Sequence, residues 1–454
     1  MRALSDVPQD FHPAAVGMDH PSLPGGPDGA VEDKSLGRRD PLGHWAMPKQ
    51  RNQSGHAMVR RTTGLECLLL IVIIALLPLE DHIPTVAGFS FSWILFGIAA
   101  IYVAFNRIRE LTVVASCPVA VTFYLFILTS TLVESAHVDP RYEEIGRVGQ
   151  MMAGAILVAA ICRDQRALKA SVSGFLISGI WLSVLLMLTV YGQISSTQAA
   201  DFEAASDLRA DVYSNAAVEL NLNTMAFIAA QGAAVSLAMA LTIKWIPARL
   251  LFLGSALLCT VAAFLPFSRS GIIIVCATCG AIAVRCRRQR FLGLILAAML
   301  GGGVLLLVPS AIISRMAFTM DRTNHMEGRA RVYTAVIDHF PEYALIGVGS
   351  GNFWGSWGSR SEFFAGELMG AHNCFFQITI YWGIPGLLSL LAVVWQAYRC
   401  VPKVRPDDAL TLALMAIAFS SLLLLFVMHN MYSKILSLGL GLLIGARCWE
   451  AARA

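Results

Sequence analysis

Long apolar segments recur along almost the whole chain, each near the length that crosses a bilayer. They lie at 63–79, 86–105, 111–133, 147–162, 171–191, 223–243, 248–266, 271–285, 291–308, 376–398, 409–428 and 432–448. A spanning helix needs about twenty apolar residues, because a lipid-exposed backbone must satisfy its own hydrogen bonds. The segments are continuous rather than alternating, which favours helices over a transmembrane barrel. We therefore predict an all-α, polytopic helical membrane protein with about twelve transmembrane helices.

Composition supports a membrane class. Hydrophobic residues make up 56% of the chain and charged residues 14%, whereas a soluble domain carries about 25% charged residues. Almost all of the ten cysteines lie in or beside apolar segments, which argues against a disulfide framework. Cys276 and Cys279 form a CxxC inside an apolar segment. Helix packing explains this pair better than a metal or redox site does.

The chain divides into four parts. Residues 1–61 are rich in Pro, Gly, Asp, Arg and His without apolar periodicity, which predicts a disordered cytoplasmic tail. The tail lacks the apolar core of a signal peptide, and Met58 is an alternative start before the first span. Residues 62–308 hold the first nine predicted helices, 309–375 form one large loop, and 376–454 hold the last three.

Lys and Arg predict the orientation of these helices. Short links rich in Lys and Arg stay in the cytoplasm. The basic links are 106–110, 163–170, 244–249, 285–290 and 399–407, and they alternate with acidic or nearly neutral links at 80–88, 134–146, 193–222 and 429–431. We therefore predict a multi-pass protein with both termini cytoplasmic and the large loop outside, which in a bacterium with two membranes is the periplasm.

The stretch Pro309–Trp382 holds most of the chemical groups. It carries five Arg, three His and no Lys. Arg binds phosphate oxygens in bidentate fashion and keeps its charge, so Arg329 and Arg331, just before a predicted helix start at Tyr333, are candidate phosphate ligands. The alternative is a solvated loop whose Arg pair with nearby acids. The chain has no P-loop and no Rossmann pattern, so no nucleotide site is expected.

A second candidate is the run Ser268, Arg269, Ser270 and Gly271 between two spans. A charged residue at that depth is costly and often functional, and the small neighbours suit close approach of a phosphate. The alternative is an Arg that extends to the lipid headgroups.

A glycine-rich turn, Gly347–Phe353, forms the third candidate. Free backbone N–H groups in such a turn, here around Gly349 and Gly351, can cradle an anion. A turn that needs positive φ is an equal alternative. The aromatic residues Phe353, Trp354 and Trp357 suit stacking on sugar rings or anchoring of the loop in the interface.

His372 and Asn373 precede a predicted span on the outer side. An imidazole near cationic Arg has its proton affinity lowered, which suits a general base. The alternative is a His that caps the helix or pairs with a backbone carbonyl. His325, His339 and His372 match no metal motif, so we expect no metal and no other cofactor.

Three segments together carry a resemblance to a known family. They are Ser268–Gly271, Glu327–Phe353 and Ala371–Leu388. In this order they resemble the O-antigen ligase and polymerase family, polytopic membrane proteins with one large periplasmic loop between late spans. Cys374 departs from the family pattern at a position that we expect to be neutral to the chemistry.

The resemblance implies a metal-independent glycosyltransferase. The donor would be a glycan on undecaprenyl diphosphate, and the acceptor lipid A–core or a second lipid-linked glycan; membrane lipids would be the remaining partners, with no nucleic acid. Carried onto this chain, Arg269 and Arg329 bind the diphosphate and His372 is the base, whereas a role for Arg147 is less direct. Arg331 is a further diphosphate ligand, and the supporting residues are Ser268, Ser270, Gly349, Gly351 and Asn373.

Three functions stay open at this point. The first is a ligase, and the second is an O-antigen or exopolysaccharide repeat-unit polymerase. The third is of another class, a polysaccharide transporter or assembly scaffold. A transporter should carry polar residues along a path inside several spans, whereas here polarity gathers at the outer ends, which favours chemistry at the membrane surface.

Overall fold

The computed structural model describes residues 61–76, 91–193, 222–266, 268–286, 290–308, 332–353, 370–371, 373–401, 408–427 and 433–453. Within these ranges the regular structure is helical and no strand occurs, so the all-α prediction is confirmed. The helices are α1 (Gly64–Leu76), α2 (Phe91–Asn106), α3 (Ile108–Ala115), α4 (Pro118–Ser135), α5 (Glu143–Ile161), α6 (Gln165–Gln193), α8 (Leu222–Thr242), α9 (Ile246–Phe264), α10 (Arg269–Arg285), α11 (Arg290–Leu307), α14 (Phe340–Tyr343), α15 (Ser350–Asn352), α17 (Cys374–Arg399), α18 (Ala409–Val427) and α19 (Lys434–Arg453). The predicted tail at 1–61 lies outside the described residues, except for Arg61.

Every predicted apolar segment contains a helix. Seven helical segments of the described chain are long and apolar enough to cross a membrane, namely Pro118–Ser135, Glu143–Ile161, Gln165–Val190, Asn223–Thr242, Ile246–Phe264, Cys374–Arg399 and Ala409–Phe426. Shorter apolar helices occur at Gly64–Leu76, Ile94–Asn106, Ser270–Arg285 and Gly293–Gly302. A multi-pass membrane protein is thus confirmed, and the number of about twelve crossings stays a prediction.

The prediction of one span at 111–133 is wrong for the first part of that segment. Helix α3 ends at Ala115, and α4 starts at Pro118 after two intervening residues. Proline is favoured at the first position of a helix, where its missing N–H costs nothing, but it cannot continue a helix from the preceding turn. Two helices therefore replace the predicted single one.

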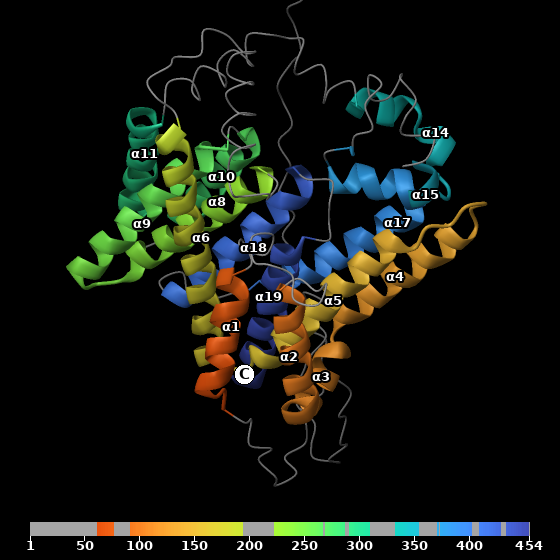
Figure 1. The fold of residues 1–454 in the computed structure, drawn as a ribbon, viewed down its shortest axis with the longest axis horizontal. Helices are drawn as coiled ribbons and strands as arrows, with labels where there is room; N and C mark the ends of the chain where they lie inside the picture. The colour runs from red at the N-terminus through yellow and green to blue at the C-terminus, as the bar shows by residue number, and fades with distance from the viewer. Residues whose placement is uncertain are drawn as a thin grey trace, which may run out of the picture. The chain divides into compact units, whose positions relative to one another are not determined.

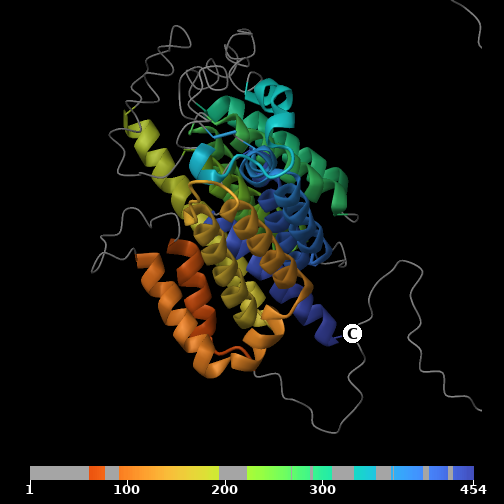
Figure 2. The same ribbon diagram turned by 90° about the vertical axis from the view of Figure 1, so that its right-hand side faces the viewer.

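Helix α8 lies at the centre of the packing. It packs against α6, α9, α10 and α18, while α1 packs on α6, α5 on α19 and α4 on α17 (Figure 1). Figure 2 shows α1 and α2 side by side. Small residues allow these close approaches. At the crossing of α6 and α8, a Cβ on Gly179 would lie only 2.6 Å from the Cα of Gly232.

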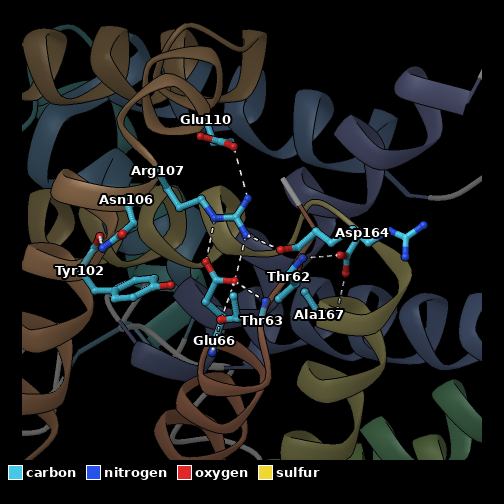
Figure 3. A network of polar contacts seen from close by, with 10 residues as sticks. Thr62, Thr63, Glu66, Tyr102, Asn106, Arg107, Glu110, Asp164 and Ala167 are labelled. Atoms are coloured by element: carbon cyan, nitrogen blue, oxygen red, sulfur yellow. Dashed lines mark hydrogen bonds and ion pairs between the residues drawn. The ribbon is translucent and has the colours of Figure 1, made fainter. Parts of the chain in front are cut away.

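A buried polar network joins the start of α1 to two links that were predicted to share the cytoplasmic side (Figure 3). Arg107, between α2 and α3, is 0% exposed and its Nε lies 2.7 Å from Oε1 of Glu66 in α1. Its Nη1 lies 3.3 Å from Oε1 of Glu110. The backbone N–H of Thr62 donates to Asp164, between α5 and α6, at 2.7 Å. These links therefore meet at one end of the helices, as the charge pattern predicted; the side of the membrane stays a prediction.

Links predicted to lie outside also come together. Nε2 of His137, after α4, lies 3.3 Å from the carbonyl oxygen of Ile346, which belongs to the predicted large loop. Asn223, at the start of α8, accepts a hydrogen bond from Ser268, at the start of α10. Each of these contacts joins two links that were predicted to lie outside.

Candidate functional site

The Ser268–Gly271 run starts helix α10. Ser268 is the N-cap residue, and its Oγ donates to Oδ1 of Asn223 at 2.6 Å instead of capping its own helix. Ser268 and Ser270 are buried. Arg269 is the first residue of α10, and its side chain lies outside what the structure describes.

Gly271 allows close helix packing. A Cβ at this position would lie 2.6 Å from the Cβ of Ala226 in α8 and 2.7 Å from the carbonyl oxygen of Ala263 in α9. The approach of a phosphate to this residue stays a prediction. Phosphate binding by Arg269, Ser268 and Ser270 stays a prediction.

The residues with the strongest chemical predictions, Arg329, Arg331 and His372, lie outside the described residues. The helix predicted to follow Arg331 is present, since residues 332–338 are helical. The buried Tyr343 in α14 donates a hydrogen bond to the carbonyl oxygen of Val336 and so closes the next turn back onto this helix.

The glycine-rich turn has the positive φ angles that the alternative interpretation required. Gly347 has φ of 71° and Gly349 has φ of 82°, a region that favours glycine. The turn lies along α17, because the N–H of Val348 donates to the carbonyl of Ile380 at 2.8 Å and the N–H of Gly349 to that of Tyr381 at 3.0 Å. Two segments of the resemblance, far apart in the sequence, are thus joined by backbone hydrogen bonds.

These hydrogen bonds satisfy carbonyl groups that lack helical donors at a break in α17. Pro385 has no N–H, so the carbonyl of Tyr381 four residues before it loses its helical donor, and Gly349 takes that place. The N–H of Ile384 donates to the carbonyl of Ala344 at 2.8 Å instead of to its own helix. Non-helical backbone within a spanning helix is tolerated where protein groups satisfy it.

The break itself lies at Trp382 and Gly383. Trp382 has φ −130° and ψ 17°, and Gly383 has φ 63° and ψ −160°. A Cβ on Gly383 would lie 2.8 Å from the backbone N of Gly347, and a Cβ on Gly347 would meet the backbone of Tyr381 and Trp382, so both glycines allow the two backbones to approach closely. The break divides α17 into an upstream half, Cys374–Tyr381, and a downstream half that ends at Arg399.

A buried carboxylate holds the turn and the break together. Glu134, near the end of α4, is 0% exposed. Its Oε2 accepts hydrogen bonds from the N–H of Ser350 at 3.0 Å and from Nε1 of Trp382 at 2.9 Å. Its Oε1 accepts from the Oγ of Ser350 at 3.1 Å, the N–H of Arg141 at 3.0 Å and the N–H of Gly351 at 3.4 Å. The turn does cradle an anion, and in this structure that anion is Glu134.

This contact bears on the predicted roles of Gly349 and Gly351. The N–H of Gly349 is occupied by Tyr381 and that of Gly351 by Glu134. A Cβ on Gly351 would lie 2.7 Å from Cγ of Arg141, so the link after α4 covers this side of the turn. Both glycines support the architecture of the site, and their contact with substrate stays a prediction.

Phe353 does not offer a face to a sugar. It is fully buried, and its ring lies edge-on to Tyr381 with centroids 5.3 Å apart. The prediction of sugar stacking is wrong for this residue because its apolar ring packs in the core beside α17. Trp354 and Trp357 lie outside the described residues.

The two neighbours of His372 are both bound to the first turns of α17. Asn373 caps the helix, since its Oδ1 accepts from the N–H groups of Phe375 at 2.9 Å and Phe376 at 3.2 Å. The N–H of Ala371 donates to Oε1 of the buried Gln377 at 2.7 Å. The backbone is therefore held directly before and directly after the predicted base.

Arg147 has a partner on its own helix. Its Nη1 lies 3.2 Å from Oε1 of Glu144, and its side chain is 48% exposed. An exposed ion pair of this kind contributes little to stability. A substrate role for Arg147 stays a prediction.

The comparison with family models bears on the class of this site. Residues 254–391 match the O-antigen ligase family. The O-antigen ligase segment starts within α9, ends within α17 and contains all three parts that carried the resemblance, which is confirmed for this part of the chain. The match supports a membrane enzyme of the O-antigen ligase and polymerase type. A comparison with curated proteins gives no match.

Sequence reasoning missed Glu134, which lies outside the O-antigen ligase segment. It was counted only as part of an acidic link. Two signals pointed to it: an acid at the last turn of an apolar helix, and Trp382, whose indole N–H needs an acceptor when it is buried in an apolar helix. Neither signal names the partner, because Glu134 and Trp382 are 248 positions apart.

Proposed function

We propose that this protein is an integral inner-membrane glycosyltransferase of the O-antigen ligase type. It transfers a glycan from undecaprenyl diphosphate to an acceptor hydroxyl. The observation that carries the proposal is the family match at 254–391, which contains Arg269, Arg329, Arg331 and His372 in one segment. The interlocking of its glycine-rich turn with the break in α17 supports a built site at that end of the helices.

The proposed reaction is a direct displacement. The acceptor oxygen attacks the anomeric carbon, and the bond from that carbon to the diphosphate oxygen breaks with its electron pair leaving on the diphosphate. The proton of the acceptor hydroxyl passes to His372. Arg269, Arg329 and Arg331 offset the negative charge that grows on the leaving group. The lipid diphosphate already activates the donor, so no nucleotide is consumed.

A complementation experiment tests this proposal. The gene is deleted and restored as wild type, His372→Ala or His339→Ala, and membrane levels are matched by immunoblot. His339 is the control because it belongs to the same loop but pairs with Glu342, with Nδ1 2.6 Å from Oε1. Surface glycolipids and lipid-linked glycans are then separated and measured.

Each outcome of the experiment has a distinct meaning. The ligase is supported if the deletion strain and the His372→Ala strain both lose long glycan from lipid A but still carry long glycan on the lipid carrier. Single repeats without long chains anywhere overturn the ligase in favour of the polymerase. Full restoration by His372→Ala overturns the proposed base, and a transporter or assembly scaffold then explains the family match better.

A further inference from the structure

Glu134 is a buried carboxylate that is stabilised by hydrogen bonds and by no cation among the described residues. Among the described residues it forms no salt bridge. Burying a carboxylate is costly unless hydrogen bonds replace its water. The donors come instead from Ser350, Gly351, Arg141 and Trp382. Through these hydrogen bonds Glu134 holds together the glycine-rich turn, the link after α4 and α17.

One oxygen of Glu134 links the two segments of the site. Oε2 accepts from the glycine-rich turn through the N–H of Ser350 and from α17 through the indole of Trp382. The indole ring is itself held from α4, since Phe126 lies edge-on to it with centroids 5.6 Å apart. Helix α4 therefore fixes both the turn and the residue at which α17 breaks.

The break makes this contact important for the start of α17. The upstream half, Cys374–Tyr381, is not continued into the downstream half by normal helical geometry at Trp382 and Gly383. Its tilt depends on the groups bound at the break. Eight residues of helix are about 12 Å long, so a tilt of about 5° at Trp382 moves the other end of this half by about 1 Å. That other end is capped by Asn373, which directly follows His372.

We infer that Glu134 is a positioning residue of the glycosyl-transfer site, whose carboxylate sets the tilt of the upstream half of α17 through Trp382 and the glycine-rich turn. The inference rests on the proposed function, because His372 is the group whose placement matters. It adds a residue from α4, outside the matched segment, to the machinery of the reaction. A displacement of about 1 Å at a catalytic group lowers the rate by about a hundredfold.

The decisive variants weaken the hydrogen bonds of Glu134, and Glu134→Gln does so at nearly constant side-chain volume. Glu134→Gln replaces one carboxylate oxygen by an amide NH2. This group faces N–H donors and cannot accept their hydrogen bonds. Trp382→Phe keeps an aromatic ring beside Phe126 but removes the indole donor together with part of the ring volume. Glu143→Gln is the matched control, since Glu143 is an exposed acid at the start of α5, at the same end of the helices. All proteins are studied as full chains in purified membranes.

Two measurements are made on each variant. The first is the transfer rate with undecaprenyl-diphosphate-linked glycan, resolved into kcat and KM. The second is backbone hydrogen exchange in peptides that cover 344–353 and 374–384. We expect Glu134→Gln to lower kcat about a hundredfold, as for a displaced catalytic group, with much smaller changes in KM. Trp382→Phe should lower kcat by less, and Glu143→Gln should change neither quantity.

Exchange is expected to rise in both peptides for Glu134→Gln and to stay at the wild-type level for Glu143→Gln. Faster exchange with wild-type kcat overturns the inference, because the carboxylate then stabilises the fold without positioning the site. Unchanged exchange in both peptides overturns it as well. Full activity of His372→Ala is a different failure: it removes the proposed base, while the exchange data still report whether Glu134 holds the two segments.

Discussion

The N–H of Gly349 donates to the carbonyl oxygen of Tyr381, the acceptor that Pro385 leaves without a helical donor. One bond therefore couples a turn of the predicted loop to the interior of a spanning helix. The break in α17 and the turn depend on each other, because the N–H and C=O groups that lack helical partners at the break form hydrogen bonds with the turn and the residues before it.

Gly347→Ala is expected to destabilise the protein strongly. An alanine at φ of 71° costs about 1–3 kcal/mol in backbone strain, and its Cβ would lie 2.2 Å from the carbonyl oxygen of Tyr381. Thermal unfolding in detergent measures the effect. Gly146→Ala in α5 is the control, because a Cβ there meets nothing within 4 Å. Equal melting temperatures for the two variants would contradict the docking of the turn.

Asn373→Ala is expected to lower both stability and glycan transfer. Loss of an N-cap side chain costs about 1 kcal/mol, and the residue before this cap is the proposed base. Asn373→Asp keeps an acceptor for the N–H groups of Phe375 and Phe376 and should recover most of the transfer. Transfer rates at matched membrane levels give the comparison. If the aspartate variant is as inactive as the alanine variant, the role of Asn373 lies beyond capping.

Arg107→Ala is expected to destabilise the predicted cytoplasmic end by about 3–5 kcal/mol, because it leaves the carboxylate of Glu66 buried without its partner. Arg109→Ala, an exposed residue of the same link, should have little effect. Replacing Glu66 and Arg107 together by leucine should cost less than Arg107→Ala alone. Unfolding in detergent measures all three. A double variant less stable than Arg107→Ala would argue against a simple buried ion pair.

Asp164 is expected to make stability fall in acid. Burial raises the pKa of its carboxyl, but hydrogen bonds from the N–H groups of Ala167 and Thr62 outweigh burial and hold the pKa below the ordinary value of 3.8. A group with a lowered folded-state pKa contributes stability that is fully present above its unfolded value and is lost as pH falls through the folded value. Wild type should therefore exceed Asp164→Asn in melting temperature above pH 3.8, with the difference shrinking below it. A difference that persists unchanged in stronger acid would show that another effect dominates.

Chelation is expected to leave glycan transfer unchanged. In the proposed reaction, fixed Arg charges offset the charge on the diphosphate, a task that divalent cations perform in other enzymes. The transfer rate in membranes is measured with and without EDTA. A loss of rate that added Mg²⁺ restores would show that a metal takes part.

The sequence determined the helical class and nearly all helix positions. Hydropathy reports these features because each helix satisfies its own backbone, so the signal is local. Charge alternation also predicted which links share an end, as the contact of Thr62 with Asp164 and that of His137 with Ile346 confirm. The break at Pro118 was misjudged, since apolar residues on both sides hide a helix end from a hydropathy window.

Only the tertiary structure decided how the candidate site is held. The glycine-rich turn was predicted either to need positive φ or to bind an anion through its N–H groups. It does both, and the anion is Glu134 of α4. The bonds of Glu134 to Ser350 and Trp382 join residues 216 and 248 positions apart. A hydrogen bond depends on where two groups meet in space. A sequence shows that Glu134 and Trp382 each need a partner, and packing of α4 on α17 selects which one each receives.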